Sequence, residues 1–388
     1  MERAGKGRLK AAWTLVLLAP LCAEAAFTGI SLPVIWLAFP LLIPIYGAGV
    51  LLARELVCRA GAGLPGLLVI GFGYEIAEDG LGLQALTSPH LYTAATWGRV
   101  LGVNVTYWES QLGYHLVFTL LIPVALTTMI FQRHGRKPYL GTFGLIGTAV
   151  VFVLGIGITR LAISSTQDPG YQTPWLVVAA ELAGIVALGV LALVVVPRLR
   201  AAHQAVAARL PVAPTGVAAQ LPEVPTGVAG QLPVVPTAVA ARLPVAPTGV
   251  VARLPQPVVM GAVAGIAPIV FLGLLFPLKS SAGQPAIGHG AWVAIPMVIA
   301  LVIAVGTGWL AARWAATDGF ADRHRIWLIG GALVGHSLCA VASGVVNGHV
   351  LLSPVLGVVI VAVTVLGCYS IGKRRDTSAS QVRLGSAR

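Results

Sequence analysis

Long apolar runs separated by short polar segments dominate the pattern along the chain. A helix of about 20 apolar residues crosses a bilayer core. Only helices or closed barrels satisfy their backbone groups in lipid, and these runs are too long and too uniformly apolar for barrel strands. The pattern therefore predicts an all-α, polytopic membrane helical bundle with about ten transmembrane helices. The expected spans are 11–30, 33–53, 64–86, 110–131, 140–163, 174–196, 257–277, 291–312, 326–346 and 350–371.

Lysine and arginine positions set the expected orientation, because cytoplasmic loops carry an excess of positive charge. With the N-terminus inside, 22 of the 25 Lys and Arg residues fall on the cytoplasmic side of the ten spans. Only Arg99, Arg160 and Lys279 fall on or near the outer side. Both termini are thus predicted to be cytoplasmic, and the expected location is the bacterial inner membrane.

The first apolar run allows a second interpretation. A basic segment at 1–10 precedes it, and Ala23-Glu24-Ala25 resembles the cleavage site of a secretory signal. Cleavage would leave the orientation of the later spans unchanged, so the charge distribution does not decide between the two. The apolar run continues through Ile30, which favours an uncleaved span.

A tandem repeat with a period of eleven residues interrupts the apolar pattern. Four copies begin at Ala208 with ARLPVAPTGVA, and each copy contains two prolines, which exclude a continuous helix. An extended or disordered linker is expected, either a simple spacer or a partner-binding segment. The predicted organisation is a six-span membrane domain (1–200), this cytoplasmic linker (201–256), a four-span membrane domain (257–372) and a basic cytoplasmic tail (373–388).

Composition narrows the function classes. Hydrophobic residues make up 57% of the chain and charged residues only 10%, which excludes an ordinary soluble enzyme. The net charge of +12 is a topology signal here, so we expect the lipid bilayer and no nucleic acid as partner. No P-loop, GxGxxG or HExxH motif is present, which leaves a nucleotide-driven pump unsupported. The sequence identifies no protein partner, and no cofactor beyond a possible divalent metal.

Small residues and prolines punctuate the apolar runs. Gly261 and Gly265 form one GxxxG pair, and Gly331 and Gly335 form another. Such pairs let helices approach closely in a membrane. Two prolines within 40–44 should kink or break the second span.

The third span carries the main chemical signal. Glu75 precedes Glu78 by three residues and Asp79 by four, a spacing that places the carboxylates on one broad helix face. At about 1.5 Å per residue, Glu78 and Asp79 lie roughly 10 Å below the outer end of their span, and His115 lies roughly 8 Å below the end of its own. Ionisable groups inside lipid usually face a cavity or a partner.

Two further glutamates fall at similar depth. Glu181 lies roughly 10 Å and Glu24 roughly 9 Å below the outer ends of their spans. Four helices thus carry ionisable groups in one outer-half layer, which predicts a polar cavity reachable from outside. The alternative is that these groups only bond neighbouring helices, with a shared depth that is accidental.

The layer suggests two chemistries. Crowded carboxylates at low dielectric cannot all ionise, so some should hold protons that can be exchanged for a cation. With Glu78 and Asp79, His115 could instead ligate zinc or manganese, and a carboxylate could act as base on metal-bound water. His336, alone in span nine, is expected to be a hydrogen-bonded packing residue. The segment 87–109 is expected on the membrane surface, as a possible lid.

An ordered set of motifs lies within 51–145: LLARELVCRAG, GYEIAEDGL, GRVLGVN, GYHLVF and RHGRKPYLG. This set resembles a family of uncharacterised polytopic membrane proteins from high-GC bacteria. The pair Glu78 and Asp79 followed by His115 is also faintly similar to the CPBP (CAAX-protease-like) intramembrane proteases. That pattern has an arginine and a phenylalanine where Leu83 and Gln111 stand here.

The leading hypothesis is a proton-coupled transporter of a small-molecule or cation substrate, with Glu75, Glu78, Asp79 and His115 as the coupling site. A metal-dependent intramembrane hydrolase using the same residues is the second hypothesis. The third is a non-catalytic scaffold or accessory subunit that works through the linker. The sequence leans away from an enzyme.

Overall fold

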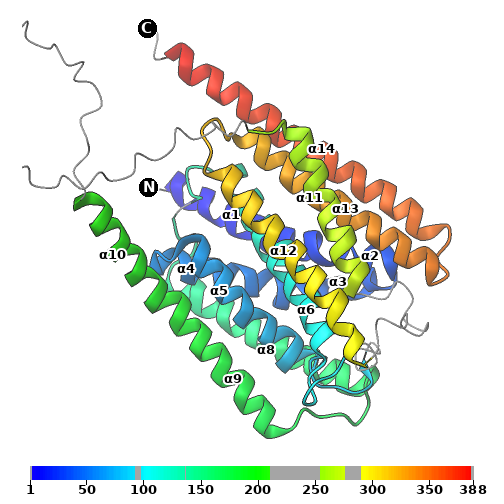
Figure 1. Cartoon of the computed structure of the whole chain (residues 1–388). Coiled ribbons are helices and arrows are strands. Elements are labelled where there is room, and N and C mark those ends of the chain that lie inside the picture. The colour runs from blue at the N-terminus through cyan, green and yellow to red at the C-terminus, as the bar shows by residue number, and fades with distance from the viewer. Residues whose placement is uncertain (1, 92–97, 136, 210–253, 276–289, 386–388) are drawn as a thin grey trace, which may run out of the picture.

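The computed structural model describes residues 2–91, 98–135, 137–209, 254–275 and 290–385. These residues form a bundle of helices, and the only β-type pairing in them is an isolated bridge between Val100 and Val103 (Figure 1). The prediction of an all-α polytopic membrane bundle is confirmed.

The helices are mostly long, and several are interrupted by π-helical turns, labelled η. In chain order they are α1 (Glu2–Pro20), η1 (Leu21–Ala25), α2 (Thr28–Ser31), α3 (Ile35–Leu42), η2 (Ile43–Ala48), α4 (Gly49–Ala60), α5 (Gly63–Glu75), η3 (Ile76–Gly82), α6 (Val105–Tyr114), η5 (His115–Leu121), α7 (Ile122–Ile130), α8 (Thr142–Thr166), α9 (Trp175–Val190), η6 (Leu191–Val195), α10 (Val196–Arg209), α11 (Pro257–Leu275), the 3₁₀ turn η8 (Gly290–Val293), α12 (Ala294–Ala315), α13 (Asp322–Val346) and α14 (Leu352–Gly385).

Eight helical stretches in the described part of the chain are long and apolar enough to cross a membrane. They are Ile35–Ala60, Val105–Ile130, Thr142–Thr166, Trp175–Ala205, Pro257–Leu275, Gly290–Ala315, Asp322–Val346 and Leu352–Arg374. The other two expected spans, the first and the third, are also helical, as α1 with η1 and as α5 with η3. These two stretches are not apolar enough to be counted with the eight, because they contain charged residues. Among these are Glu24 and Glu75, which are described with the candidate site below.

Segments expected on the cytoplasmic side lie together. The start of α1, the end of α10 and the end of α14 are at one end of the bundle in Figure 1. Side-chain contacts agree, since Arg200 on α10 donates to the carbonyl oxygen of Gly61 after α4 (2.8 Å). Helix α10 continues to Arg209, inside the expected linker, and the rest of the repeat, 210–253, lies outside the described residues. Helix α14 continues through most of the expected tail.

Helices α11 and α13 pack through the two GxxxG pairs. A Cβ atom added to Gly331 would stand 2.0 Å from the carbonyl oxygen of Gly261. One added to Gly335 would stand 1.9 Å from the carbonyl oxygen of Gly265. Only glycine permits the two backbones to approach so closely, so the two GxxxG pairs form the contact between α11 and α13.

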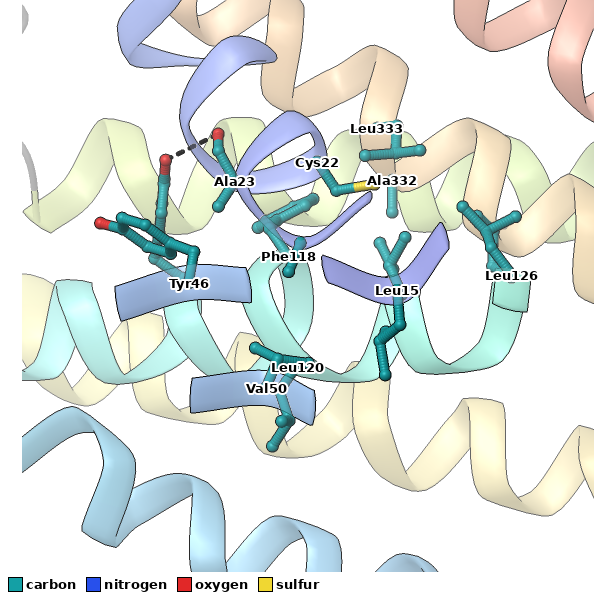
Figure 2. Packing of buried hydrophobic residues seen from close by; sticks show 14 of the residues in the cluster. Leu15, Cys22, Ala23, Tyr46, Val50, Phe118, Leu120, Leu126, Ala332 and Leu333 are labelled. Atoms are coloured by element: carbon teal, nitrogen blue, oxygen red, sulfur yellow. Dashed lines mark hydrogen bonds between the residues drawn. The ribbon is translucent and has the colours of Figure 1, made fainter. Parts of the chain in front are cut away.

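The apolar core joins the first and last thirds of the chain. Figure 2 shows Leu15 of α1, Phe118 of η5 and Leu333 of α13 in one packed cluster. Leu15 has no exposed surface. Helix α1 is therefore part of the core.

A buried ionic cluster joins α4 to the loop between α7 and α8. The Arg54 guanidinium on α4 contacts Glu55 (2.6 Å), lies 3.5 Å above the Tyr139 ring and donates to the carbonyl oxygens of Gly135 and Lys137. The Glu55 carboxylate accepts the backbone N–H groups of Tyr139 (2.7 Å) and of the residue after it (3.2 Å). We call Arg54, Glu55 and Tyr139 the inner clamp.

Candidate functional site

Four π-helical segments carry the polar residues of the candidate site. Glu24 lies in η1, Tyr46 in η2, Glu78 and Asp79 in η3, and His115 in η5. A π turn widens the helix by one residue and often marks a functional position. The wider turns displace these side chains from the register of a regular α-helix, so that they meet inside the bundle.

Glu75, Glu78, Asp79 and His115 come together in one buried group, which we call the acidic cluster. The His115 Nε2 atom lies 3.8 Å from Glu75 Oε2 and 3.9 Å from Asp79 Oδ2. His115 Nδ1 lies 3.5 Å from Glu78 Oε2. All four side chains are at most 3% exposed. The predicted layer of ionisable groups thus includes direct side-chain contacts between α5, η3 and η5.

A threonine one turn away orients the imidazole. His115 Nδ1 is within 2.9 Å of Thr119 Oγ1, also in η5, and this contact leaves Nε2 facing Glu75 and Asp79. One ligand atom from each of Glu75, Asp79 and His115 lies within 4.8 Å of the others. The structure therefore selects Glu75 for this arrangement, whereas the sequence pointed to Glu78, which lies on the Nδ1 side.

Several oxygens in the acidic cluster lack hydrogen-bond donors among the described residues. In their ionised form, both carboxylate oxygens of Glu75, one of Glu78 and one of Asp79 are buried without a donor in this part of the chain, and the Glu75 and Asp79 carboxyl groups lie close enough to hydrogen-bond through a shared proton. Buried polar groups in folded proteins are nearly always hydrogen-bonded. The unmet capacity of these atoms indicates a place where a proton or a cation is accommodated.

Tyrosine hydroxyls surround the cluster, and sequence reasoning did not select them. Tyr107 on α6 donates to Asp79 Oδ1 (3.3 Å), and Tyr46 donates to Glu24 Oε1 (2.9 Å). Tyr114 donates to the Ala23 carbonyl oxygen (2.9 Å), a bond marked in Figure 2. Tyr107 lies in the segment 87–109 that was expected on the membrane surface, but α6 begins at Val105 and its Tyr107 side chain is buried. Tyr114 directly precedes His115 in the sequence, and this position was the signal that could have identified it as a neighbour of the site.

The two outlying glutamates occupy the edge of the site. Glu24 accepts hydrogen bonds from Tyr46 and Tyr114 and is near enough to Glu78 and Asp79 to interact with them electrostatically. The carboxylate of Glu181 on α9 packs against Gly80, where an added Cβ would stand 2.7 Å from its Oε1. Neither belongs to the acidic cluster itself.

Arg160 on α8 lies beside Glu181 rather than in the cluster. Its guanidinium donates to the carbonyl oxygen of Leu81 (2.9 Å) and to the side chain of Gln172 (3.1 Å). It is close enough to Glu181 to interact with that carboxylate electrostatically. The arginine thus ties η3 to α8 and to the segment before α9.

His336 lies on the other side of Tyr114. Its ring stacks on Phe118 with centroids 3.8 Å apart and lies 5.0 Å from the Tyr114 ring. The packing role expected for His336 is present, but neither ring nitrogen has a hydrogen-bond partner in the described part of the chain. Tyr114 and Phe118 also line an apolar cavity of about 330 Å³ between η5, α11, α12 and α13.

Comparison with protein families identifies the chain's relatives. A model described as an uncharacterized membrane protein family matches residues 14–367, so the chain belongs to that family. The match extends far beyond 51–145, where the sequence motifs suggested a resemblance. No curated protein and no solved structure matches the chain.

Proposed function

We propose that this member of the uncharacterised membrane protein family is a proton-coupled transporter of a small solute or cation in a bacterial inner membrane. The acidic cluster is its coupling site. One observation carries the proposal: Glu75 is fully buried, no donor among the described residues reaches either oxygen of its ionised carboxylate, and it lies beside two more carboxylates and an imidazole. Charged groups held inside a membrane bundle are typical of proton and ion pathways.

The charge balance of the cluster supports exchange. Among the described residues, His115 is the only basic side chain within 4 Å of the carboxylates of Glu75, Glu78 and Asp79. Three carboxylates this close together at low dielectric cannot all be ionised without compensating positive charge. That charge comes from protons or from a bound cation, and replacing one by the other couples their movements.

The surroundings supply further proton carriers. Glu24 of η1, Tyr46 of η2 and Tyr107 of α6 approach the cluster from three helices. On the outer side, Glu181 adjoins the turn that follows Asp79. These groups extend the cluster toward neighbouring helices, as a proton path requires.

Access from outside requires the segment 83–91 to move. The Asn104 side chain holds it by donating to the carbonyl oxygens of Ala85 (2.7 Å) and Ser88 (2.8 Å). Asp168, after α8, accepts the Ser88 hydroxyl and contacts the ring of His90 (3.2 Å). An outward-opening motion breaks these contacts together with those that join Gln84 and Thr87 to the segment before α9.

Charge movement across the protein tests the proposal. We would reconstitute the full chain in liposomes on a solid-supported membrane and record the current evoked by a pH jump. The wild-type protein is expected to give a transient current that Glu75→Gln and Asp79→Asn abolish. Asp322→Asn is the matched control, since its carboxylate pairs with Arg325 at the start of α13, away from the cluster. Equal currents from wild type and Glu75→Gln would refute the coupling role.

A further inference from the structure

We infer that Glu75, Asp79 and His115 form a binding site for a divalent transition-metal cation. The inference rests on the proposed function, because it makes that cation the substrate that is exchanged for protons. It concerns a defined set of three donors on α5, η3 and η5, with Glu78 next to them.

The donors already surround one point. Glu75 Oε2 and Asp79 Oδ2 face the same nitrogen, His115 Nε2, at 3.8 and 3.9 Å, and all three ligand atoms fall within 4.8 Å of one another. Metal–ligand bonds to such atoms are about 2.0–2.2 Å long. A cation between the three atoms therefore requires only small side-chain adjustments.

The unsatisfied oxygens give an independent argument. When Glu75 and Asp79 are both ionised, as ligation requires, both Glu75 oxygens and Asp79 Oδ2 are buried without a donor among the described residues, and the Glu75 side chain has no exposed surface. The structural carboxylate of Glu55, by contrast, accepts backbone hydrogen bonds with both oxygens in the inner clamp. A cation would satisfy the oxygens that the protein leaves free.

The residues behind the ligands have the arrangement that metal sites use. A ligating histidine usually bonds its other ring nitrogen to an acceptor that fixes its orientation. Here Thr119 Oγ1 and Glu78 Oε2 lie 2.9 and 3.5 Å from His115 Nδ1. Tyr107 holds the other oxygen of Asp79 in the same way. Glu78 is thus an orienting neighbour rather than a ligand.

The donor set selects the class of cation. Mg²⁺ and Ca²⁺ take oxygen ligands, and Mg²⁺ keeps several waters. An imidazole combined with carboxylates suits zinc, manganese, iron or cobalt. A divalent ion also balances the two ligating carboxylates, as the buried setting requires.

Cobalt(II) titration of the purified, full-length protein tests the site. Co²⁺ reports nitrogen and oxygen ligation through its visible absorption, and equilibrium dialysis gives the stoichiometry. We expect one Co²⁺ per chain, displaced by Zn²⁺ and not by Mg²⁺. Glu75→Gln, Asp79→Asn and His115→Ala should weaken binding by about 100-fold or more, and Thr119→Val by about tenfold, as orienting partners do.

Matched controls separate ligation from folding. Asp322→Asn and His203→Gln change a carboxylate and an imidazole outside the cluster and should bind Co²⁺ as the wild type does. Glu78→Gln lies inside the cluster and should retain binding, weakened by about tenfold at most. Binding that survives Glu75→Gln and Asp79→Asn would overturn the inference, as would folded wild-type protein that binds no Co²⁺.

The pH-jump currents distinguish failure of this inference from failure of the proposed function. Currents that depend on Glu75, in a protein that binds no Co²⁺, would leave a proton-coupling site and remove the metal. Stoichiometric Co²⁺ that depends on Glu75, in a protein without currents, would keep the metal site and refute coupled transport. Uptake of Co²⁺ into vesicles, driven by a proton gradient and lost in Glu75→Gln, is the result expected when both hold.

Discussion

The inner clamp and the acidic cluster are two buried ionic groups in the same bundle, and each centres on a glutamate with no exposed surface. In the inner clamp, Glu55 accepts two backbone N–H groups and contacts Arg54 at 2.6 Å. In the acidic cluster, no donor among the described residues reaches the ionised Glu75 carboxylate, which lies beside Asp79 and 3.8 Å from the imidazole nitrogen His115 Nε2. The same residue type is fully satisfied in one place and unsatisfied in the other.

This difference distinguishes a buried carboxylate with a structural role from one that is available to bind a ligand. Breaking a buried ion pair with complete hydrogen bonding destabilises the fold, because removing one partner leaves an uncompensated charge. A buried carboxylate without partners adds nothing to stability and keeps its capacity for a ligand. The comparison teaches that burial alone does not identify a site in a membrane protein, and that several ionisable groups meeting around unmet bonding capacity are the more specific sign.

The largest expected effect is at the inner clamp. Glu55→Gln removes the charge opposite Arg54 and places an amide N–H₂ group where backbone N–H groups now donate. The free energy of unfolding should fall by about 3–5 kcal/mol, the usual result of breaking a buried pair. Unfolding in mixed detergent micelles measures it. A loss below about 1 kcal/mol, which is typical of an exposed ion pair, would contradict the structural role assigned to the inner clamp.

The same substitution at Glu75 should act in the opposite direction. Glu75→Gln removes repulsion from Asp79 and Glu78, and the new amide N–H₂ group can donate to their carboxylates. The free energy of unfolding should rise by about 1 kcal/mol, a gain typical of relieving a functional site. The measurement is the same micelle unfolding, run beside Glu55→Gln. A loss as large as that of Glu55→Gln would mean that the two regions are alike.

Much of the fold could be predicted from hydropathy and charge, because the bilayer imposes the length and composition of each span. The GxxxG pairs were also readable, since small residues at that spacing serve close helix contacts. The inner clamp could not be predicted from the sequence, because the partners of Glu55 are backbone N–H groups of a loop that is distant along the chain. The contact of Glu55 with Arg59, four residues later on the same helix, is longer, at 3.9 Å.

The candidate site was predicted in its members but not in its geometry. Depth arguments placed Glu75, Asp79 and His115 in one layer, and the structure brings them into contact. The choice of Glu75 over Glu78 depends on the π-helical turns, which hydropathy does not reveal. Prolines were a partial signal: Pro20 precedes η1, Pro44 lies in η2 and Pro123 follows η5 closely. A proline lacks the N–H group of a regular turn, so wider turns accommodate it.

The prediction with the smallest expected effect tests whether Glu24 is a structural residue, like those of the inner clamp, or a member of the acidic cluster. Glu24 is bonded by Tyr46 and Tyr114, like a clamp residue, yet it lies beside Glu78, like a member of the cluster. Tyr46→Phe deletes one hydroxyl donor and leaves the other. Because hydrogen bonds inside membrane proteins contribute about 0.6 kcal/mol on average, the free energy of unfolding should fall by about that amount.

The pH-jump current of Tyr46→Phe supplies the second half of this test. If Glu24 only joins η1 to its neighbours, the current keeps its wild-type amplitude, because Tyr114 still holds the carboxylate. Tyr114→Phe is the matched variant, since it deletes the other donor to the same oxygen. A current lost in both variants, at a stability change of about 0.6 kcal/mol each, would show that Glu24 shares protons with Glu78 and Asp79. The acidic cluster would then extend from η3 and η5 into η1.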